Sequence, residues 1–111
     1  MTKLVVLWKS DNLVDIQEMI TPYIIASKKN GWWDSVEVII WGPSQKIVVE
    51  NDDVKRRVAL MTKQNIPLYA CKKCAEDLNV DQALENLGVN VMYTGELLTD
   101  FLQSDAKVIT L

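Results

Sequence analysis

Residues 66–74 read Ile66-Pro67-Leu68-Tyr69-Ala70-Cys71-Lys72-Lys73-Cys74, an apolar run that passes directly into a Cys-x-x-Cys pair. A short apolar run of this kind predicts a buried strand from Ile66 to Ala70, in which Pro67 is tolerated only near the start. The polar residues after it predict a helix from Lys72 to Leu78. The pair, which contains the only cysteines of the chain, is therefore expected at a strand-to-helix junction.

The same alternation extends in both directions along the chain. Further apolar runs predict strands at residues 4–8, 36–41, 89–93 and 107–111. Helical spacing and capping residues predict helices that start near Asp11 or Asn12, after Asn51, at Asp81 and after Thr94. Pro22 is expected to kink or split the first of these helices near Thr21. Residues 46–50 fit either a strand or a short helix capped by Ser44.

Strands that alternate with helices imply right-handed crossovers and hence a parallel sheet. We therefore expect one α/β domain over residues 1–111, a three-layer α/β/α fold with a five-stranded parallel sheet. Ligands of such sheets bind beyond the carboxyl ends of the strands. The residues predicted there, as a pocket around Cys71, are Trp8, Lys9, Ser10, Trp41, Gly42, Pro43, Lys72 and Tyr93, with Thr94 and Gly95 beside them.

Cys71 is the candidate nucleophile of the chain. Backbone amides at the start of a helix and the neighbouring Lys72 and Lys73 favour its thiolate, which is the reactive form of cysteine. The alternative is that Cys71 is a small apolar residue at the end of a buried strand. Cys74 is interpreted as a resolving thiol or second sulfur carrier, or as an apolar position packed in a row with Ala75 and Leu78.

The composition excludes several classes of function. The chain lacks histidine, so serine and cysteine triads that need one are excluded, and two thiolates alone leave a zinc site half filled. No metal and no cofactor are expected. The net charge of −3 and the absence of a basic stripe argue against nucleic acid. No apolar run is long enough for a membrane span or a signal peptide, so a reducing cytoplasmic location is expected.

The order of these motifs resembles that of the DsrE/DsrF-like (YchN-like) family over essentially the whole chain. The similarity is carried by the Gly31-Trp32 turn, Trp41-Gly42-Pro43-Ser44, Ala70-Cys71-x-x-Cys74-Ala75, Val89-x-Val91 and Gly95-x-x-Leu98-Thr99. The resemblance implies a three-layer domain assembled as trimers or hexamers. It also implies sulfur relay, with a persulfide on Cys71 received from a donor protein and passed to an acceptor. Cys74 matches a second cysteine that only some relatives have.

Three functions remain open from the sequence. The first is a sulfurtransferase-like carrier that holds sulfur on Cys71. The second is an oligomeric binding or regulatory module in which both cysteines are structural. The third is a dithiol-disulfide switch between Cys71 and Cys74. Oligomerisation is also expected because Ile47, Val48 and Val49, with the adjacent tryptophans, are predicted to leave apolar surface exposed.

Overall fold

Five strands form one parallel sheet in the computed structural model of the protein, which describes every residue from Met1 to Leu111. The sheet order is β4-β3-β2-β1-β5, and every neighbouring pair is parallel. The strands are β1 (Lys3–Trp8), β2 (Ser35–Ile40), β3 (Leu68–Cys71), β4 (Asn90–Met92) and β5 (Lys107–Thr110). The five predicted strands are confirmed, although the third begins two residues later than expected and includes Cys71.

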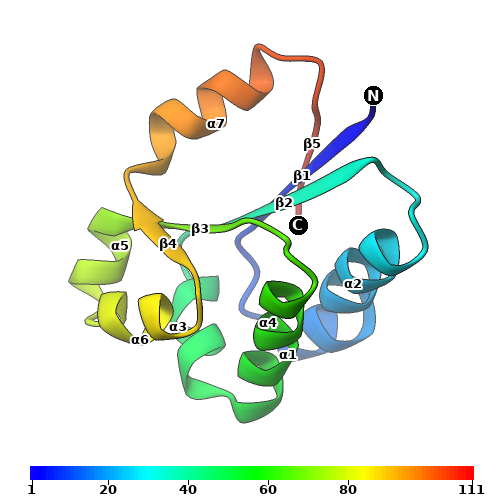
Figure 1. The fold of residues 1–111 in the computed structure, drawn as a ribbon. Coiled ribbons are helices and arrows are strands. Elements are labelled where there is room, and N and C mark those ends of the chain that lie inside the picture. Colours follow the sequence, from blue (N-terminus) through cyan, green and yellow to red (C-terminus); the bar gives the residue numbers. More distant parts are fainter.

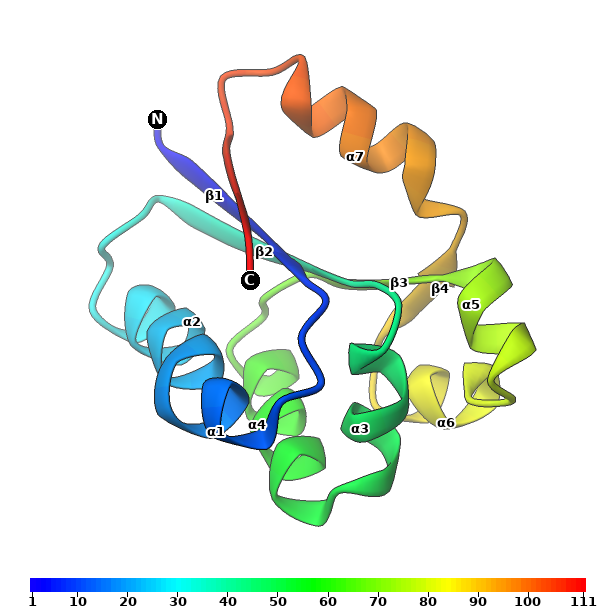
Figure 2. The ribbon, with the colours of Figure 1, turned by 180° about the vertical axis from the view of Figure 1, so that it is seen from behind.

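Helices cover both faces of this sheet, so the predicted three-layer arrangement is confirmed. Helices α1 to α4 and α6 lie on one side, whereas α7 lies alone on the other (Figure 1, Figure 2). The helices are α1 (Leu13–Asp15), η1 (Ile16–Ile20), α2 (Thr21–Lys29), α3 (Ser44–Glu50), α4 (Asp52–Lys63), α5 (Lys72–Asp77), α6 (Asp81–Asn86) and α7 (Thr94–Leu102). No helix combines the length and apolar character that crossing a membrane requires.

The expected disruption at Pro22 takes the form of a π-helical turn. The N–H of Thr21 bonds to the carbonyl of Ile16, five residues earlier, and Pro22 then occupies the first turn of α2. Proline has no N–H and cannot donate the regular helical hydrogen bond, and the turn before it is π-helical instead of α-helical. The Thr21 hydroxyl donates to the same Ile16 carbonyl at 2.7 Å.

Residues 44–50 are helical, which resolves the ambiguity of this segment. In α3, Val48 is fully buried, and Ile47 and Val49 pack partly buried against the core. The expectation that this segment exposes apolar surface is therefore wrong, because Val48 faces the core and its two neighbours are partly covered. The exposed apolar side chains lie elsewhere, among them Val14, Trp32, Tyr93 and Leu102.

The capping predictions are confirmed in part. Asn12 and Asn51 accept hydrogen bonds from the N–H groups of Asp15 and Val54, as expected of N-caps. Ser44, Asp81 and Thr94 are not caps, since each is the first helical residue after Pro43, Val80 and Tyr93 respectively. The hydroxyl of Ser44 instead donates to the carbonyl of Trp8 at 2.7 Å, which ties α3 to the end of β1.

The main core lies between the sheet and the helices η1, α2, α3, α4, α5 and α6. Alternate residues of β1 and β2 point into it, and 20 buried residues form one cluster. Those from the three central strands are Leu4, Val6, Trp8, Val36, Val38, Ile40, Leu68 and Ala70. Each buried aliphatic side chain contributes about 1.5–3 kcal/mol through removal from water, so this layer holds the carboxyl ends of the strands in place.

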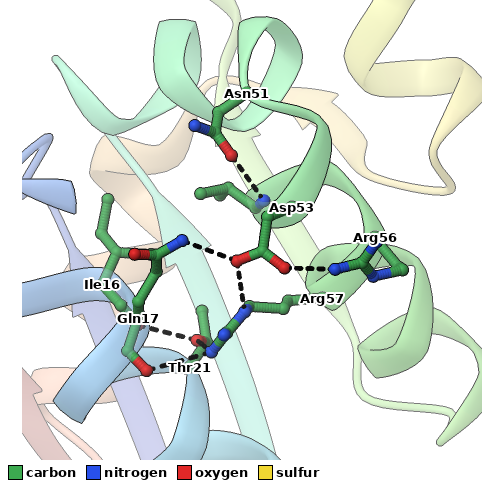
Figure 3. Close-up of polar contacts among 8 residues, drawn as sticks. Ile16, Gln17, Thr21, Asn51, Asp53, Arg56 and Arg57 are labelled. Carbon is green, nitrogen blue, oxygen red and sulfur yellow. Dashed lines mark hydrogen bonds and ion pairs between the residues drawn. The ribbon is translucent and has the colours of Figure 1, made fainter. Parts of the chain in front are cut away.

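A polar cluster fastens the π-helical turn to α4. The carboxylate of Asp53 accepts from Gln17, Arg56 and Arg57, as Figure 3 shows. Arg57 also donates to the Gln17 carbonyl and to the Thr21 hydroxyl, both at 3.0 Å. These bonds connect segments about 40 positions apart in the chain, since Gln17 and Arg57 are separated by 40 residues.

Candidate functional site

The carboxyl ends of β1, β2 and β3 meet around a buried glutamine. The side-chain amide of Gln45, in α3, donates to the Ile40 carbonyl at 3.0 Å and to the Cys71 carbonyl at 3.2 Å. Gln45 is fully buried. The carboxyl ends of β2 and β3 are thus held at a fixed separation, and this constraint fixes the position of Cys71.

Cys71 is the last residue of β3 and the N-cap of α5, with an extended backbone. Its side chain is nearly enclosed, because the residue is 7% exposed. Burial raises the pKa of the thiol, but the Cys74 and Lys73 N–H groups, the Cys74 thiol and the nearby Thr94 hydroxyl all favour the thiolate and outweigh it, so the pKa is lowered overall. The site therefore favours a Cys71 thiolate.

Cys74 lies one turn further along α5 and is partly exposed. Burial raises the pKa of its thiol, and the bond to Cys71 and the charge of that thiolate raise it further. The Gly42 N–H and the Trp41 ring N–H lower the pKa of the Cys74 thiol, but the net direction is upward. The two free thiols thus have opposite tendencies, and the Cys74 thiol donates to the Cys71 thiolate.

The turn after β2 brings Gly42 to the Cys74 sulfur. Gly42 has a φ of +76°, a left-handed conformation that glycine adopts without steric cost. This turn directs the Gly42 N–H at Cys74 and leads directly into α3. A glycine is therefore needed here for the backbone geometry of the thiol pair.

A groove of about 700 Å³ opens beside Cys74, between α5 and the turn that joins β2 to α3. The residues that line it are Asp11, Gly42, Pro43, Lys46, Ile47, Glu50, Cys74, Asp77 and Leu78. Its volume lies in the range of small-molecule sites. Cys71 does not line the groove, so the exposed thiol and the thiol of lowered pKa are different residues.

The predicted pocket residues separate into three groups. Gly42 and Pro43 line the groove, and Trp41 directs its ring N–H at Cys74. Lys72 places its ammonium 5.5 Å from the ring centre of Tyr93, beside the two thiols in sequence. The third group, Trp8, Lys9 and Ser10, does not line the groove.

Trp8 belongs to the core, and its two neighbours hold the chain that leaves β1. The Trp8 ring is fully buried and donates to the Ser10 carbonyl at 2.9 Å. The Lys9 N–H bonds to the carbonyl of Leu111 at 2.8 Å, and the Ser10 hydroxyl accepts from the N–H of Asn12. These three residues fix the end of β1 rather than forming a wall of the groove.

Sequence reasoning did not identify the roles of Gln45 and Thr94 at the thiols. Thr94 is almost fully buried, and its hydroxyl has no hydrogen-bond partner of full geometry, yet it lies near enough to Cys71 to lower the pKa of that thiol. The position of Thr94 directly after the fourth predicted strand was the signal that could have placed it at the site. No group of three or more histidine, cysteine, aspartate or glutamate side chains is arranged to hold a metal ion.

Comparison with known proteins places the chain beside two solved structures. The first is a conserved protein of unknown function, BT1422 from Bacteroides thetaiotaomicron, with 34% identity and a TM-score of 0.95 over 98% of this chain and 94% of that one. The second is the ychN protein from E. coli, with 17% identity and a TM-score of 0.73 over the full length of both chains. No family model and no curated protein matches. The YchN-like fold expected from the sequence is confirmed.

Proposed function

The chain belongs to the same family as BT1422, a conserved protein of unknown function, and from the chemistry of its own thiols we propose that it carries sulfur as a persulfide on Cys71. The feature that supports this most is that two neighbouring thiols have pKa values shifted in opposite directions. The Cys71 pKa is lowered despite burial, and the Cys74 pKa is raised. A thiolate is the nucleophile in sulfur transfer, because the thiol form is a poor one.

The transfer has two redox-neutral steps. The Cys71 thiolate attacks the outer sulfur of a donor persulfide, R–S–SH, so that a Cys71–sulfur bond forms, the donor's S–S bond breaks and R–S⁻ leaves. An acceptor thiolate then attacks the outer sulfur of the Cys71 persulfide, takes it, and restores the Cys71 thiolate. No external oxidant or reductant is needed in either step.

The groove beside Cys74 is where donor and acceptor would approach. Cys74 lines it while Cys71 is nearly enclosed, so a bound thiol reaches the pair from the Cys74 side. In its protonated form Cys74 donates a hydrogen bond to Cys71, which keeps the charge on Cys71. Cys74 therefore supports the carrier without itself being the nucleophile.

This function would place the protein in sulfur relay of the DsrE-like type, as a sulfurtransferase-like carrier in a reducing cytoplasm. The fold shared with the ychN protein supports this placement. Donor and acceptor would be partner proteins, and the carrier itself a homo-oligomer, a trimer or a hexamer. Exposed apolar side chains on α7 and β5, Leu102 and Ile109, support assembly.

The test is uptake of one sulfur atom by the reduced protein. Incubation with inorganic polysulfide or glutathione persulfide, followed by intact-mass spectrometry, is expected to show one added sulfur that cyanide removes. Cys71→Ser is expected to abolish the adduct, and Cys74→Ser, the matched control, to retain it. An adduct that persists in Cys71→Ser, or its absence from the parent protein with both donors, would refute the proposal.

A second candidate follows from the enclosure of Cys71, which is 7% exposed. In that case the protein is a binding or regulatory module and both cysteines pack the junction of β3 and α5. This alternative predicts that iodoacetamide modifies Cys71 no faster than an unstructured cysteine peptide at neutral pH. It also predicts that Cys71→Ser leaves the oligomeric state unchanged, as measured by light scattering.

A further inference from the structure

Thr94 has a buried hydroxyl that the fold leaves without a partner. The residue is 1% exposed, and its Oγ1 makes no hydrogen bond within the protein. Buried hydroxyls are normally paired, because loss of hydration without a replacement bond is unfavourable. An unpaired one beside a candidate nucleophile therefore calls for an acceptor that is present only in another state of the site.

The topology brings Thr94 to the carboxyl end of β3, where its hydroxyl lies near enough to Cys71 to favour the thiolate. Cys71 pairs with Met92 across the β3–β4 ladder, and Thr94 follows Met92 by two residues as the first residue of α7. A neutral thiol is a weak acceptor, whereas a thiolate or a persulfide anion is a strong one. The hydroxyl thus gains its acceptor when the Cys71 sulfur carries charge.

The first turn of α7 adds further donors to the same place. The leading N–H groups of a helix have no partner within it, and they favour an anion. α7 has nine residues, and no side chain caps its leading N–H groups. These amides are therefore available to an added sulfur atom.

Two lysines and the second thiol follow Cys71 on α5. Lys72 lies over the ring of Tyr93, the residue before Thr94. Lys73 is paired with Asp77 at 2.8 Å. The Cys74 thiol faces Cys71 from the groove side. No carboxylate from β3, β4 or the first turn of α7 is hydrogen-bonded to Thr94.

We propose that Thr94 is a positioning residue for the cargo, and that its hydroxyl donates to the outer sulfur of a Cys71 persulfide. This inference rests on the proposed function. The first amides of α7 hold the same sulfur, and the donor's departing thiolate leaves on the opposite side, through the groove that Cys74 lines. The cargo sulfur is thereby kept away from solvent until an acceptor enters the groove.

The test compares Thr94→Val, which removes the hydroxyl at nearly constant volume, with Thr94→Ser, which keeps it. Thr99→Val is the matched control, because Thr99 is exposed on the same helix and bonds only to the Gly95 carbonyl. The first measurement is the rate of Cys71 alkylation by iodoacetamide as a function of pH. The second is the half-life of the sulfur on Cys71 after loading with polysulfide and removal of the donor.

Thr94→Val is expected to slow Cys71 alkylation about fivefold near pH 7, since it removes one hydrogen bond to a charged sulfur. It is also expected to shorten the half-life of the loaded sulfur about threefold. Thr94→Ser and Thr99→Val are expected to behave like the parent protein. If Thr94→Val does not fold, as judged by circular dichroism, Thr94→Ala replaces it in both measurements.

The outcomes separate this inference from the proposed function. If the parent protein takes up no sulfur, the carrier function fails, and the alkylation curves still show whether Thr94 acts on Cys71. If sulfur is taken up and neither measurement changes in Thr94→Val, the carrier stands and the role of Thr94 is refuted. A loss in Thr94→Ser as large as in Thr94→Val would also refute it, because the hydroxyl would then not be the cause.

Discussion

The side-chain amide of Gln45 donates to the main-chain carbonyl of Cys71, with Nε2 3.2 Å from that oxygen. The same amide donates to the carbonyl of Ile40 at 3.0 Å. One buried side chain of α3 thereby joins the carboxyl ends of two neighbouring strands, β2 and β3. The position of the candidate nucleophile depends on a residue that forms no part of the thiol chemistry.

Gln45→Leu is expected to lower the free energy of unfolding by about 1–3 kcal/mol, because two buried carbonyls lose their donor. Urea denaturation followed by tryptophan fluorescence measures the effect. Gln82→Leu is the control, since Gln82 is exposed on α6 and bonds only to Asn86. A Gln45→Leu protein as stable as the control would show that water or repacking replaces both bonds.

The coupling of the two thiols predicts reciprocal effects of substitution. Cys71→Ser removes the negative charge and the acceptor that raise the Cys74 pKa, so Cys74 is expected to react faster with iodoacetamide at about pH 8. Cys74→Ser removes the Cys74 thiol as a donor to Cys71, although the serine hydroxyl replaces it in part. Cys74→Ala is therefore expected to slow the alkylation of Cys71 by iodoacetamide more than Cys74→Ser does.

Peptide mapping by mass spectrometry gives the rate for each thiol separately. In the parent protein Cys71 is expected to be modified first near neutral pH, despite its smaller exposure. If Cys74 reacts first, and at a rate unaffected by Cys71→Ser, the two thiols titrate independently. That result would contradict the charge distribution on which the carrier chemistry depends.

The architecture was predictable because local patterns and global topology agree. Continuous apolar runs predicted the five strands, and strand-helix alternation then required parallel pairing. The segment after Gly42-Pro43 was ambiguous since β-branched residues favour strands on propensity alone. Its helical state is decided by burial of Val48 and Gln45 against the sheet, which is a tertiary contact.

The site was predictable only as far as position along the sheet. Cys71, Gly42 and Pro43 follow from the rule that ligands gather at strand ends. That rule does not tell whether the last residue of a strand faces the core or the groove, so it does not predict the burial of Trp8, the last residue of β1. The contacts of Asp53 and Arg57 with each other and with Gln17, 36 and 40 residues away, could not be predicted, because only the tertiary structure brings α4 beside the π-helical turn.

The raised pKa of Tyr69 predicts that the protein loses stability at alkaline pH. Burial, with the hydrogen bond to Glu37 at 2.7 Å and its charge, raises the pKa of Tyr69 from 10.0 to about 12. The fold therefore prefers the neutral phenol, whereas the unfolded chain ionises it from about pH 10 upward. The contribution of Tyr69 is fully present below pH 10 and is lost as the pH rises toward 12.

Tyr69→Phe is expected to make the decline in unfolding free energy between about pH 9 and about pH 11 shallower than in the parent protein. Tyr93→Phe is the control, because Tyr93 is 66% exposed and has no side-chain hydrogen bond to lose. Urea titrations at the two pH values measure both proteins. An unchanged slope in Tyr69→Phe would show that another group governs the alkaline limb.

Arg57 and Arg56 are adjacent in sequence but contribute differently to stability. The Arg57 side chain is 30% exposed and reaches the π-helical turn through Gln17 and Thr21, whereas that of Arg56 is 76% exposed and bonds only to Asp53 (Figure 3). Arg57→Ala is expected to cost about 1–3 kcal/mol of unfolding free energy. Arg56→Ala, the matched control, is expected to cost about 0–1 kcal/mol.

Acid titration tests the same cluster in a second way. The Gln17 amide, followed by the charges and bonds of Arg57 and Arg56, lowers the pKa of Asp53 below its ordinary 3.8. A lowered carboxyl pKa stabilises the fold at pH values above the pKa of the unfolded state. This stabilisation is lost as the pH falls through the pKa of the folded state. Arg57→Ala is therefore expected to show a smaller loss of stability below about pH 4 than the parent protein. Equal acid slopes in the two proteins would mean that Gln17 and Arg56 hold the Asp53 carboxylate in its charged form without Arg57.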